Sequence, residues 1–262
     1  MKLWRPGWFD GVALVVGAAL PDLVFVGGCC GPPQTYGHTG WGIVVGMPVT
    51  LVVARLVRWA APAAAAHLPQ LGWFALRDYG VLGVVQHPWW VSAASALLGA
   101  ASHVGWDNVT HASMVGTGLG LPSLGREAFV GVPWWILLHL ISTIVGAAGW
   151  LALSLYIGRN RLLVRWHGPA PVVAPRPRLF WCTAVTVAGA GVVVTTALAI
   201  AGRHDAVTFL APPPKPMVLV MRMFCVGALA MVTGAAAVRA VAVRDGAGGA
   251  RQLNRTAEIP SD

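Results

Sequence analysis

The sequence is short of charge, and of acidic residues in particular. Only 10% of its 262 residues are charged, and nine aspartates and glutamates stand against 18 lysines and arginines. Soluble globular proteins carry roughly a quarter charged residues, so a soluble domain is excluded as a description of the whole chain. Hydrophobic residues instead make up 56%, with a mean hydropathy of +0.68. This composition is typical of an integral membrane protein.

Cysteine is also scarce, and its arrangement is uninformative. Two of the four cysteines, Cys29 and Cys30, are adjacent, which matches neither a CxxC zinc motif nor a secreted disulfide framework. The formal net charge of +9 is spread between apolar segments rather than gathered into one basic patch. We therefore assign the cysteines no role and expect no nucleic-acid partner.

Apolar runs of about 20 residues, the length that crosses a bilayer, recur along the chain without an internal repeat. The predicted fold class is an all-α membrane bundle of six transmembrane helices, near residues 8–28, 40–59, 89–111, 133–157, 179–201 and 217–241. Residues 60–87 combine aromatic and charged side chains, which indicates an interfacial segment. We predict one transmembrane domain over residues 1–243 and a polar, disordered tail over residues 244–262.

The first apolar run has a second interpretation, as a signal peptide. Lys2 and Arg5 precede it, and Gly27-Gly28-Cys29 resembles a lipoprotein cleavage site. Cleavage there would remove Asp22, so we favour an uncleaved first helix.

Lysines and arginines are distributed unequally between alternate loops. With six helices, fourteen lie on one side of the membrane and four on the other. The positive-inside rule then places both termini in the cytoplasm, which requires an even number of crossings. We expect a multi-pass protein of a bacterial inner (cytoplasmic) membrane.

Residues 102–111 read Ser-His-Val-Gly-Trp-Asp-Asn-Val-Thr-His and end the third predicted helix. His103, Asp107 and His111 recur every four residues, which aligns them on one face because an α-helix turns once per 3.6 residues. Imidazole and carboxylate groups suit zinc, and also manganese or iron. The stripe predicts one wall of a metal site.

Further polar groups lie at a similar depth, counted at about 1.5 Å per residue into a hydrocarbon core of about 30 Å. Charges in hydrocarbon cost at least about 2.5 to 3.5 kcal/mol each, so we expect these groups to be paired or coordinated. The sequence indicates how deep these groups lie in the membrane, but it does not determine whether they lie next to one another, which depends on helix packing. The predicted metal ligands are Asp22, His38, His103 and Asp107, and the predicted catalytic residues are His111, His139 and Arg222.

Each residue also has a purely structural interpretation. His139 could form a hydrogen bond between helices, and Asp22 could cap a helix that resumes after a proline. Asp107 could bond within its own turn, and Arg222, our candidate anion clamp, could extend to the interface instead. The remaining histidines are expected to be solvated in loops: His67, His87, His167 and His204.

Several motifs resemble one known family. Pro21-Asp22, His38-Thr39, the 102–111 element and His139 with Ser142 are similar to the bacterial membrane family called domain of unknown function 4184, over the whole chain. That family resembles membrane-bound metal-dependent hydrolases of the LexA-regulated type and, more distantly, zinc-dependent phospholipase C. The resemblance implies metal ligands or their immediate partners at Asp22, His38, His103 and Asp107, with His111 and His139 as further candidates.

One departure from the family pattern concerns the N-terminus. Family members usually begin with a histidine ahead of the first apolar segment, whereas residues 2–8 here read Lys-Leu-Trp-Arg-Pro-Gly-Trp. If that histidine is a ligand elsewhere, this protein has either a reduced site or no catalysis.

We expect a metal-dependent hydrolase that acts on an ester or phosphoester of a lipid or lipid-linked substrate, with its site in the outer half of the membrane. Zinc is the first choice of metal, with one position left for water. A transporter or ion pathway that uses the same cluster is one alternative, and a non-catalytic membrane protein is another. The lack of an internal repeat and of polar residues in the inner half argues against the transporter.

Overall fold

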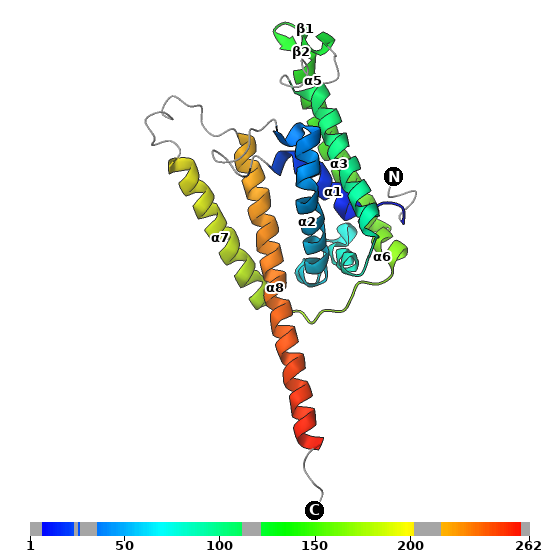
Figure 1. Cartoon of the computed structure of the whole chain (residues 1–262), viewed down its shortest axis with the longest axis vertical. Helices are drawn as coiled ribbons and strands as arrows, with labels where there is room; N and C mark the ends of the chain where they lie inside the picture. Colours follow the sequence, from blue (N-terminus) through cyan, green and yellow to red (C-terminus); the bar gives the residue numbers. More distant parts are fainter. Residues whose placement is uncertain (1–6, 24–25, 27–35, 112–121, 202–215, 258–262) are drawn as a thin grey trace, which may run out of the picture.

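The computed structural model of the chain describes the backbone of residues 7–23, 26, 36–111, 122–201 and 216–257. It describes the side chains of all of these except residues 201, 216–217 and 246–257. The Cys29-Cys30 pair, the lipoprotein-like motif at 27–29 and His204 lie outside the described residues. The described part is almost entirely helical (Figure 1).

The α-helices of the described part begin close to the predicted positions. Proline precedes or opens several of them, as at Pro88, Pro133 and Pro177, because its fixed φ and missing N–H suit the first turn of a helix. The helices are α1 (Gly11–Ala19), α2 (Gly40–His67), α3 (Trp89–Thr110), α5 (Trp134–Arg159), α6 (Leu162–His167), α7 (Pro177–Ala201) and α8 (Pro216–Ala257).

Four described helices are long and apolar enough to cross a membrane: Gly40–His67, Trp134–Arg159, Pro177–Ile200 and Val218–Asp245. Helix α3 has 22 residues, or about 33 Å, which is enough to cross, but its polar residues lower its hydropathy. Helix α1 has only nine residues. The chain therefore has the helices of a membrane protein, while six crossings and cytoplasmic termini stay predictions.

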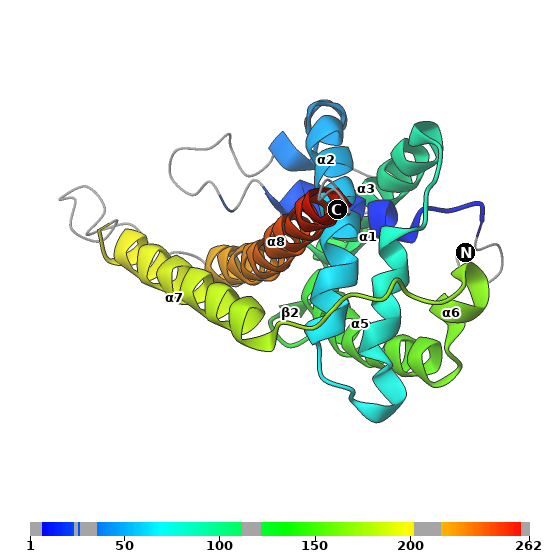
Figure 2. The same cartoon turned by 90° about the horizontal axis from the view of Figure 1, so that it is seen from below.

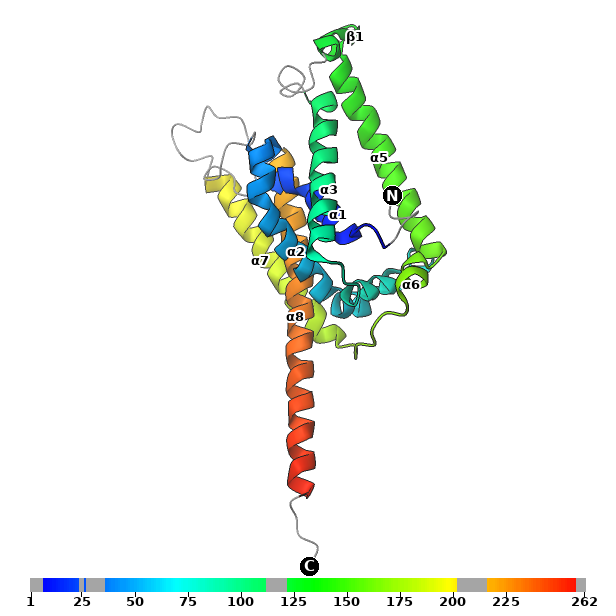
Figure 3. The same ribbon diagram turned by 45° about the vertical axis from the view of Figure 1, so that its right-hand side comes forward.

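Two helices extend beyond their predicted ends. Helix α2 continues past Trp59 to His67, because the alanines on both sides of Pro62 favour helix strongly enough to continue it through that proline. Helix α8 continues past Arg244, where we predicted a disordered tail, to Ala257. Once a long span has nucleated a helix, each added residue costs little, so the polar stretch prolongs α8 (Figure 3).

The connections contain short elements that periodicity did not reveal. Residues 60–87 include the 3-10 helices η3 (Gly72–Phe74) and η4 (Leu76–Gly83) at the end of α2. The described part of the connection between α3 and α5 contains η5 (Pro122–Gly125) and a hairpin of β1 (Glu127–Phe129) and β2 (Val132–Pro133). Its turn contains Gly131, whose φ of 72° favours glycine.

Helices α1 and α3 cross at small residues. A Cβ atom on Gly17 would collide with the backbone of Ala96, and one on Gly99 would collide with the backbone of Leu14. Such close backbone approach is typical of helix pairs in membranes. The hydrophobic effect does not drive helices together there, and small side chains instead allow close van der Waals packing of the two backbones. This crossing sets the position of α3 relative to the segment that follows α1.

A buried polar cluster ties α1, α2 and α3 together at the ends remote from His38 and Asp107. Asp10, which is fully buried, accepts the Ala13 N–H at 3.0 Å as the N-cap of α1 and pairs with Arg58 of α2. On α3, Ser92 donates to Asp10. Our expectation that this half of the bundle lacks polar groups was therefore wrong.

Helices α7 and α8 form a pair that joins the rest of the bundle where α8 packs on α2 (Figures 1 and 2). A core cluster at this junction includes Ala63, Phe180 and Val238. His67 lies beside it, stacked on Phe180 with ring centroids 4.5 Å apart, and is 7% exposed. The prediction of a solvated loop histidine was wrong here, because α2 extends far enough to bury residue 67.

Candidate metal centre

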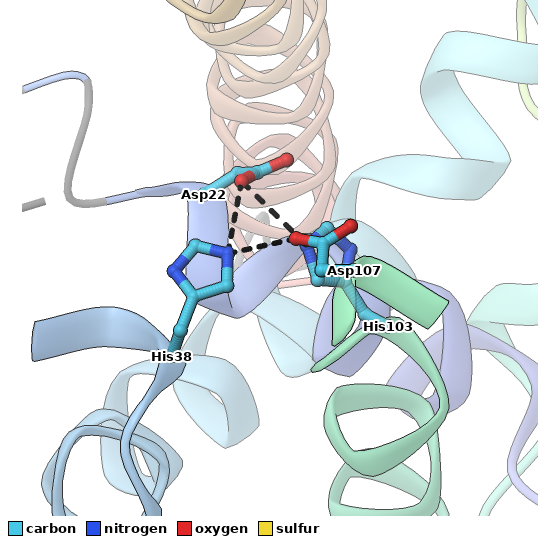
Figure 4. Close-up of side chains that lie close together, drawn as sticks. All are labelled: Asp22, His38, His103 and Asp107. Atoms are coloured by element: carbon cyan, nitrogen blue, oxygen red, sulfur yellow. Dashed lines mark hydrogen bonds and ion pairs between the residues drawn. The ribbon is translucent and has the colours of Figure 1, made fainter. Parts of the chain in front are cut away.

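The four predicted metal ligands come from three separate parts of the chain and meet at one point (Figure 4). Asp22 lies in a 3-10 turn at residues 20–23, directly after α1. His38 ends the 3-10 helix η2 (Tyr36–His38), just before α2. His103 and Asp107 lie one turn apart near the end of α3.

Pro21 and Thr39 determine the backbone conformation around Asp22 and His38, the two ligands that lie outside the α-helices. The Leu20 N–H bonds to the Gly17 carbonyl in a 3-10 pattern, and Pro21 has no N–H with which to continue an α-helix. The turn that results carries Asp22. Thr39 caps α2, since its Oγ1 accepts the Gly42 N–H at 3.0 Å and donates to the Tyr36 carbonyl at 2.7 Å. These bonds fix the backbone beside His38.

The ligand atoms of the four side chains all lie within 4.8 Å of one another. The His38 Nε2 atom lies 3.0 Å from Asp107 Oδ2 and 3.7 Å from Asp22 Oδ1. The His103 Nε2 atom lies 3.1 Å from Asp107 Oδ2 and 3.6 Å from Asp22 Oδ1. Ligands held tetrahedrally at about 2.0 to 2.1 Å from zinc are about 3.3 Å apart, and the four distances bracket this value.

The surroundings of the cluster also favour a cation. The four side chains are between 6% and 20% exposed. Two carboxylates this close together repel each other in a buried site unless a positive charge lies between them. The buried His103 Nε2 faces carboxylate oxygens of both Asp107 and Asp22, an arrangement that suits an ion held between them. The donor set and spacing therefore fit a divalent metal, and metal binding itself stays a prediction.

His111 and His139 lie beside the cluster rather than in it. The His111 Nδ1 atom lies 3.4 Å from Asp107 Oδ1 and 3.1 Å from the Thr110 hydroxyl, and its side chain is 45% exposed. The His111 ring packs edge to face against the ring of His139 on α5, with the two ring centroids 5.1 Å apart. The hydroxyl groups of Ser142 and Thr143 donate to the backbone carbonyl of His139 rather than to its imidazole. The imidazole contacts His111.

Arg222 approaches the segment around Asp22 but is not one of the clustered residues. Its Nε donates to the Val26 carbonyl at 3.3 Å. This contact ties α8 to the chain just after Asp22. The role of Arg222 as an anion clamp stays a prediction, since no described contact tests it.

The family model for Domain of unknown function (DUF4184) matches residues 3–243. The chain belongs to this family. No curated protein and no solved structure matches it. The resemblance based on the 102–111 element is thus confirmed at the level of the family, whose description assigns no activity.

Sequence reasoning missed two features of this DUF4184 protein. One is the capping role of Thr39, for which the signal was a threonine followed by an apolar helix. The other is the pairing of Asp10 with Arg58, which are 48 residues apart in sequence. No local pattern links that pair, because their contact depends on how α1 packs against α2.

Proposed function

We propose that this DUF4184 protein is a membrane-embedded metal-dependent hydrolase that acts on an ester or phosphoester of a lipid or lipid-linked substrate. The observation that carries the proposal is the convergence of Asp22, His38, His103 and Asp107, with ligand atoms within 4.8 Å of one another. Two imidazole nitrogens and two carboxylate oxygens suit zinc, with manganese or iron as alternatives.

A bound divalent ion would supply Lewis acidity and make a water molecule acidic enough to act as a nucleophile near neutral pH. Asp22, Asp107, His38 and His103 would hold the ion.

His111 is the residue we propose as general base. Its Nδ1 faces Asp107 Oδ1, so a proton on Nδ1 would point to the carboxylate and leave Nε2 to accept a proton from water. Its partial exposure gives the substrate access. His139 supports the ring of His111 through their edge-to-face contact.

The proposed topology has six crossings, with α1 and α3 added to the four apolar helices, and both termini in the cytoplasm of a bacterial inner membrane. The charge distribution supports it, since fourteen of 18 lysines and arginines then lie inside. The cluster would lie in the outer half of the membrane. A lipid or lipid-linked substrate suits a site at that depth.

The first prediction tests metal binding. Full-length protein purified in mild detergent should contain about one zinc, manganese or iron per chain, as ligand sets of this kind bind divalent ions tightly. The variants His103→Ala and Asp107→Asn should lose this metal, whereas the control variants His167→Ala and Asp245→Asn should keep it. Elemental analysis by mass spectrometry measures the content.

The proposal would be overturned by wild-type protein that holds no stoichiometric metal and gains none with added zinc or manganese. Folded His103→Ala protein that loses hydrolysis of lipid phosphoesters favours the enzyme. If the same variant fails to fold and the wild type binds no metal, the four residues only hold helices together.

A transporter is the second candidate function. The buried pair of Asp10 and Arg58, with Ser92 beside it, places polar groups in the bundle half that does not hold the metal centre. Polar groups at both levels are what an ion pathway needs. Vectorial uptake of protons or metal ions into liposomes, abolished in Asp107→Asn, would favour this function over hydrolysis.

A further inference from the structure

A second cavity lies along the middle of α2 and beside the start of α3, away from the candidate metal centre. It has a volume of about 650 Å³, extends along α2 from Pro48 to Trp59 and is bordered by residues before and at the start of α3, including Gln86 and Trp89. Its volume lies within the range of small-molecule sites, about 300 to 1,000 Å³. The reaction proposed above does not involve this cavity.

Basic groups gather at one end of the cavity. Arg55, Arg58 and His87 line it, and its described lining contains no aspartate or glutamate. Asp10 compensates Arg58 from behind, whereas Arg55 has no ion-pair partner among the described side chains. The cavity therefore presents at least one uncompensated positive charge.

Arg58 contributes an unused donor as well. Its side chain is 14% exposed, and its buried Nε has no hydrogen-bond partner within the described part of the chain. A buried donor without a partner is costly. An anion in the cavity would satisfy that donor and the charge of Arg55 together.

The other end of the cavity is apolar. Pro48, Leu51 and Val52 line it, and Pro48 lies seven residues, or about 10 Å, from Arg55 along the helix. Trp59 and Trp89, at the basic end, are 40% and 70% exposed, as expected of aromatic residues at a membrane interface. The cavity thus runs from an interfacial, basic end toward the hydrocarbon core.

We propose that this cavity binds the phosphate group of an anionic membrane lipid, with an acyl chain along Pro48, Leu51 and Val52. The guanidinium groups of Arg55 and Arg58 match the geometry of a phosphate, to which arginine donates paired hydrogen bonds. The basic end of the cavity, at the membrane interface, suits the phosphate of the headgroup, and the apolar end, deeper in the membrane, suits the acyl chain.

The test uses full-length protein in nanodiscs of phosphatidylcholine, with or without phosphatidylglycerol. Native mass spectrometry should show one retained phosphatidylglycerol per wild-type chain, and this lipid should raise the thermal unfolding temperature. Arg55→Gln should weaken retention about tenfold, the loss expected for one charge-assisted bond. The control Arg165→Gln removes an exposed arginine outside the cavity and should retain the lipid like the wild type.

Three results would overturn the proposal: no retained phosphatidylglycerol in the wild type, equal loss in Arg55→Gln and Arg165→Gln, or equal stabilisation by inorganic phosphate in phosphatidylcholine alone. The last would show a soluble phosphate as the ligand. Val52→Trp provides a second variant that narrows the apolar end without a change in charge, and it should also reduce retention.

Discussion

At the scale of single residues, hydrogen-bond and ion-pair partners distinguish buried histidines with different roles. His38 and His103 face carboxylates from two helical segments, whereas His67 faces only backbone and an aromatic ring. The Nδ1 of His67 lies 2.6 Å from the Ala63 carbonyl, and its Nε2 accepts the Arg176 N–H at 2.8 Å. Both nitrogens are therefore engaged, and His67 acts as a structural link between α2 and the segment before α7.

His67→Ala should lower the thermal unfolding temperature by several degrees and leave the metal content unchanged. The variant removes two hydrogen bonds of about 1 kcal/mol each and the stacking on Phe180. Thermal unfolding followed by circular dichroism, with elemental analysis of the same samples, measures both quantities. His167→Ala serves as control, and equal unfolding temperatures for the two variants would contradict the structural role.

At the scale of elements, the four-residue cluster of the candidate metal centre depends on the crossing of α1 and α3. Gly17 and Gly99 allow the two backbones to touch, and this contact brings the turn with Asp22 beside His103 and Asp107. Helix α5 differs, because it packs mainly near its ends, on η3 and on α3. It supplies His139 to the site without shaping the four-residue cluster.

Gly99→Val should separate α1 from α3 and weaken metal binding about tenfold or more, a loss of roughly 1.4 kcal/mol. The β-branched side chain has no space against the Leu14 carbonyl. Gly146→Val on α5, where the structure leaves open space around the glycine, is the matched control. Metal titration of both proteins tests this, and wild-type affinity in Gly99→Val would refute the dependence on the crossing.

At the scale of the whole molecule, the proposed ion would reinforce segments that already pack through the apolar side chains of Leu20, Ile43 and Ala100. It would connect the turn after α1, the start of α2 and the end of α3, while the Asp10 and Arg58 pair joins the same helices at their other ends. A ligand that binds only the folded state stabilises it by about 2.7 kcal/mol at 100 times its dissociation constant. The two polar clusters would then hold the bundle at both levels.

Chelation should therefore lower the unfolding temperature of the wild type, and added zinc should restore it. The double variant His38→Ala, His103→Ala should unfold at one temperature under both conditions, since it has lost two of four donors. Scanning calorimetry in detergent compares them. A wild type that is indifferent to the chelator would contradict a stabilising ion.

Local patterns determined most of the helices and pointed to the four polar residues that the structure brings together. Apolar run length marked α2, α3, α5 and α7, because a membrane span needs about 20 apolar residues whatever its neighbours. The four-residue spacing of His103 and Asp107 determined their shared face. The ends of α2 and α8 and the β1–β2 hairpin escaped this reasoning, since helix propagation and turn formation act beyond the apolar pattern.

Only the tertiary structure decided which polar groups meet. Asp22, His38 and Asp107 are far apart in sequence, and their depths alone left their lateral positions open. The backbone contact at Gly17 and Gly99 and the cap at Thr39 bring them together. The same packing buries Asp10 with Arg58 and His67 with Phe180. Spacing along a helix sets the face and depth of a side chain, whereas helix crossings set its partners.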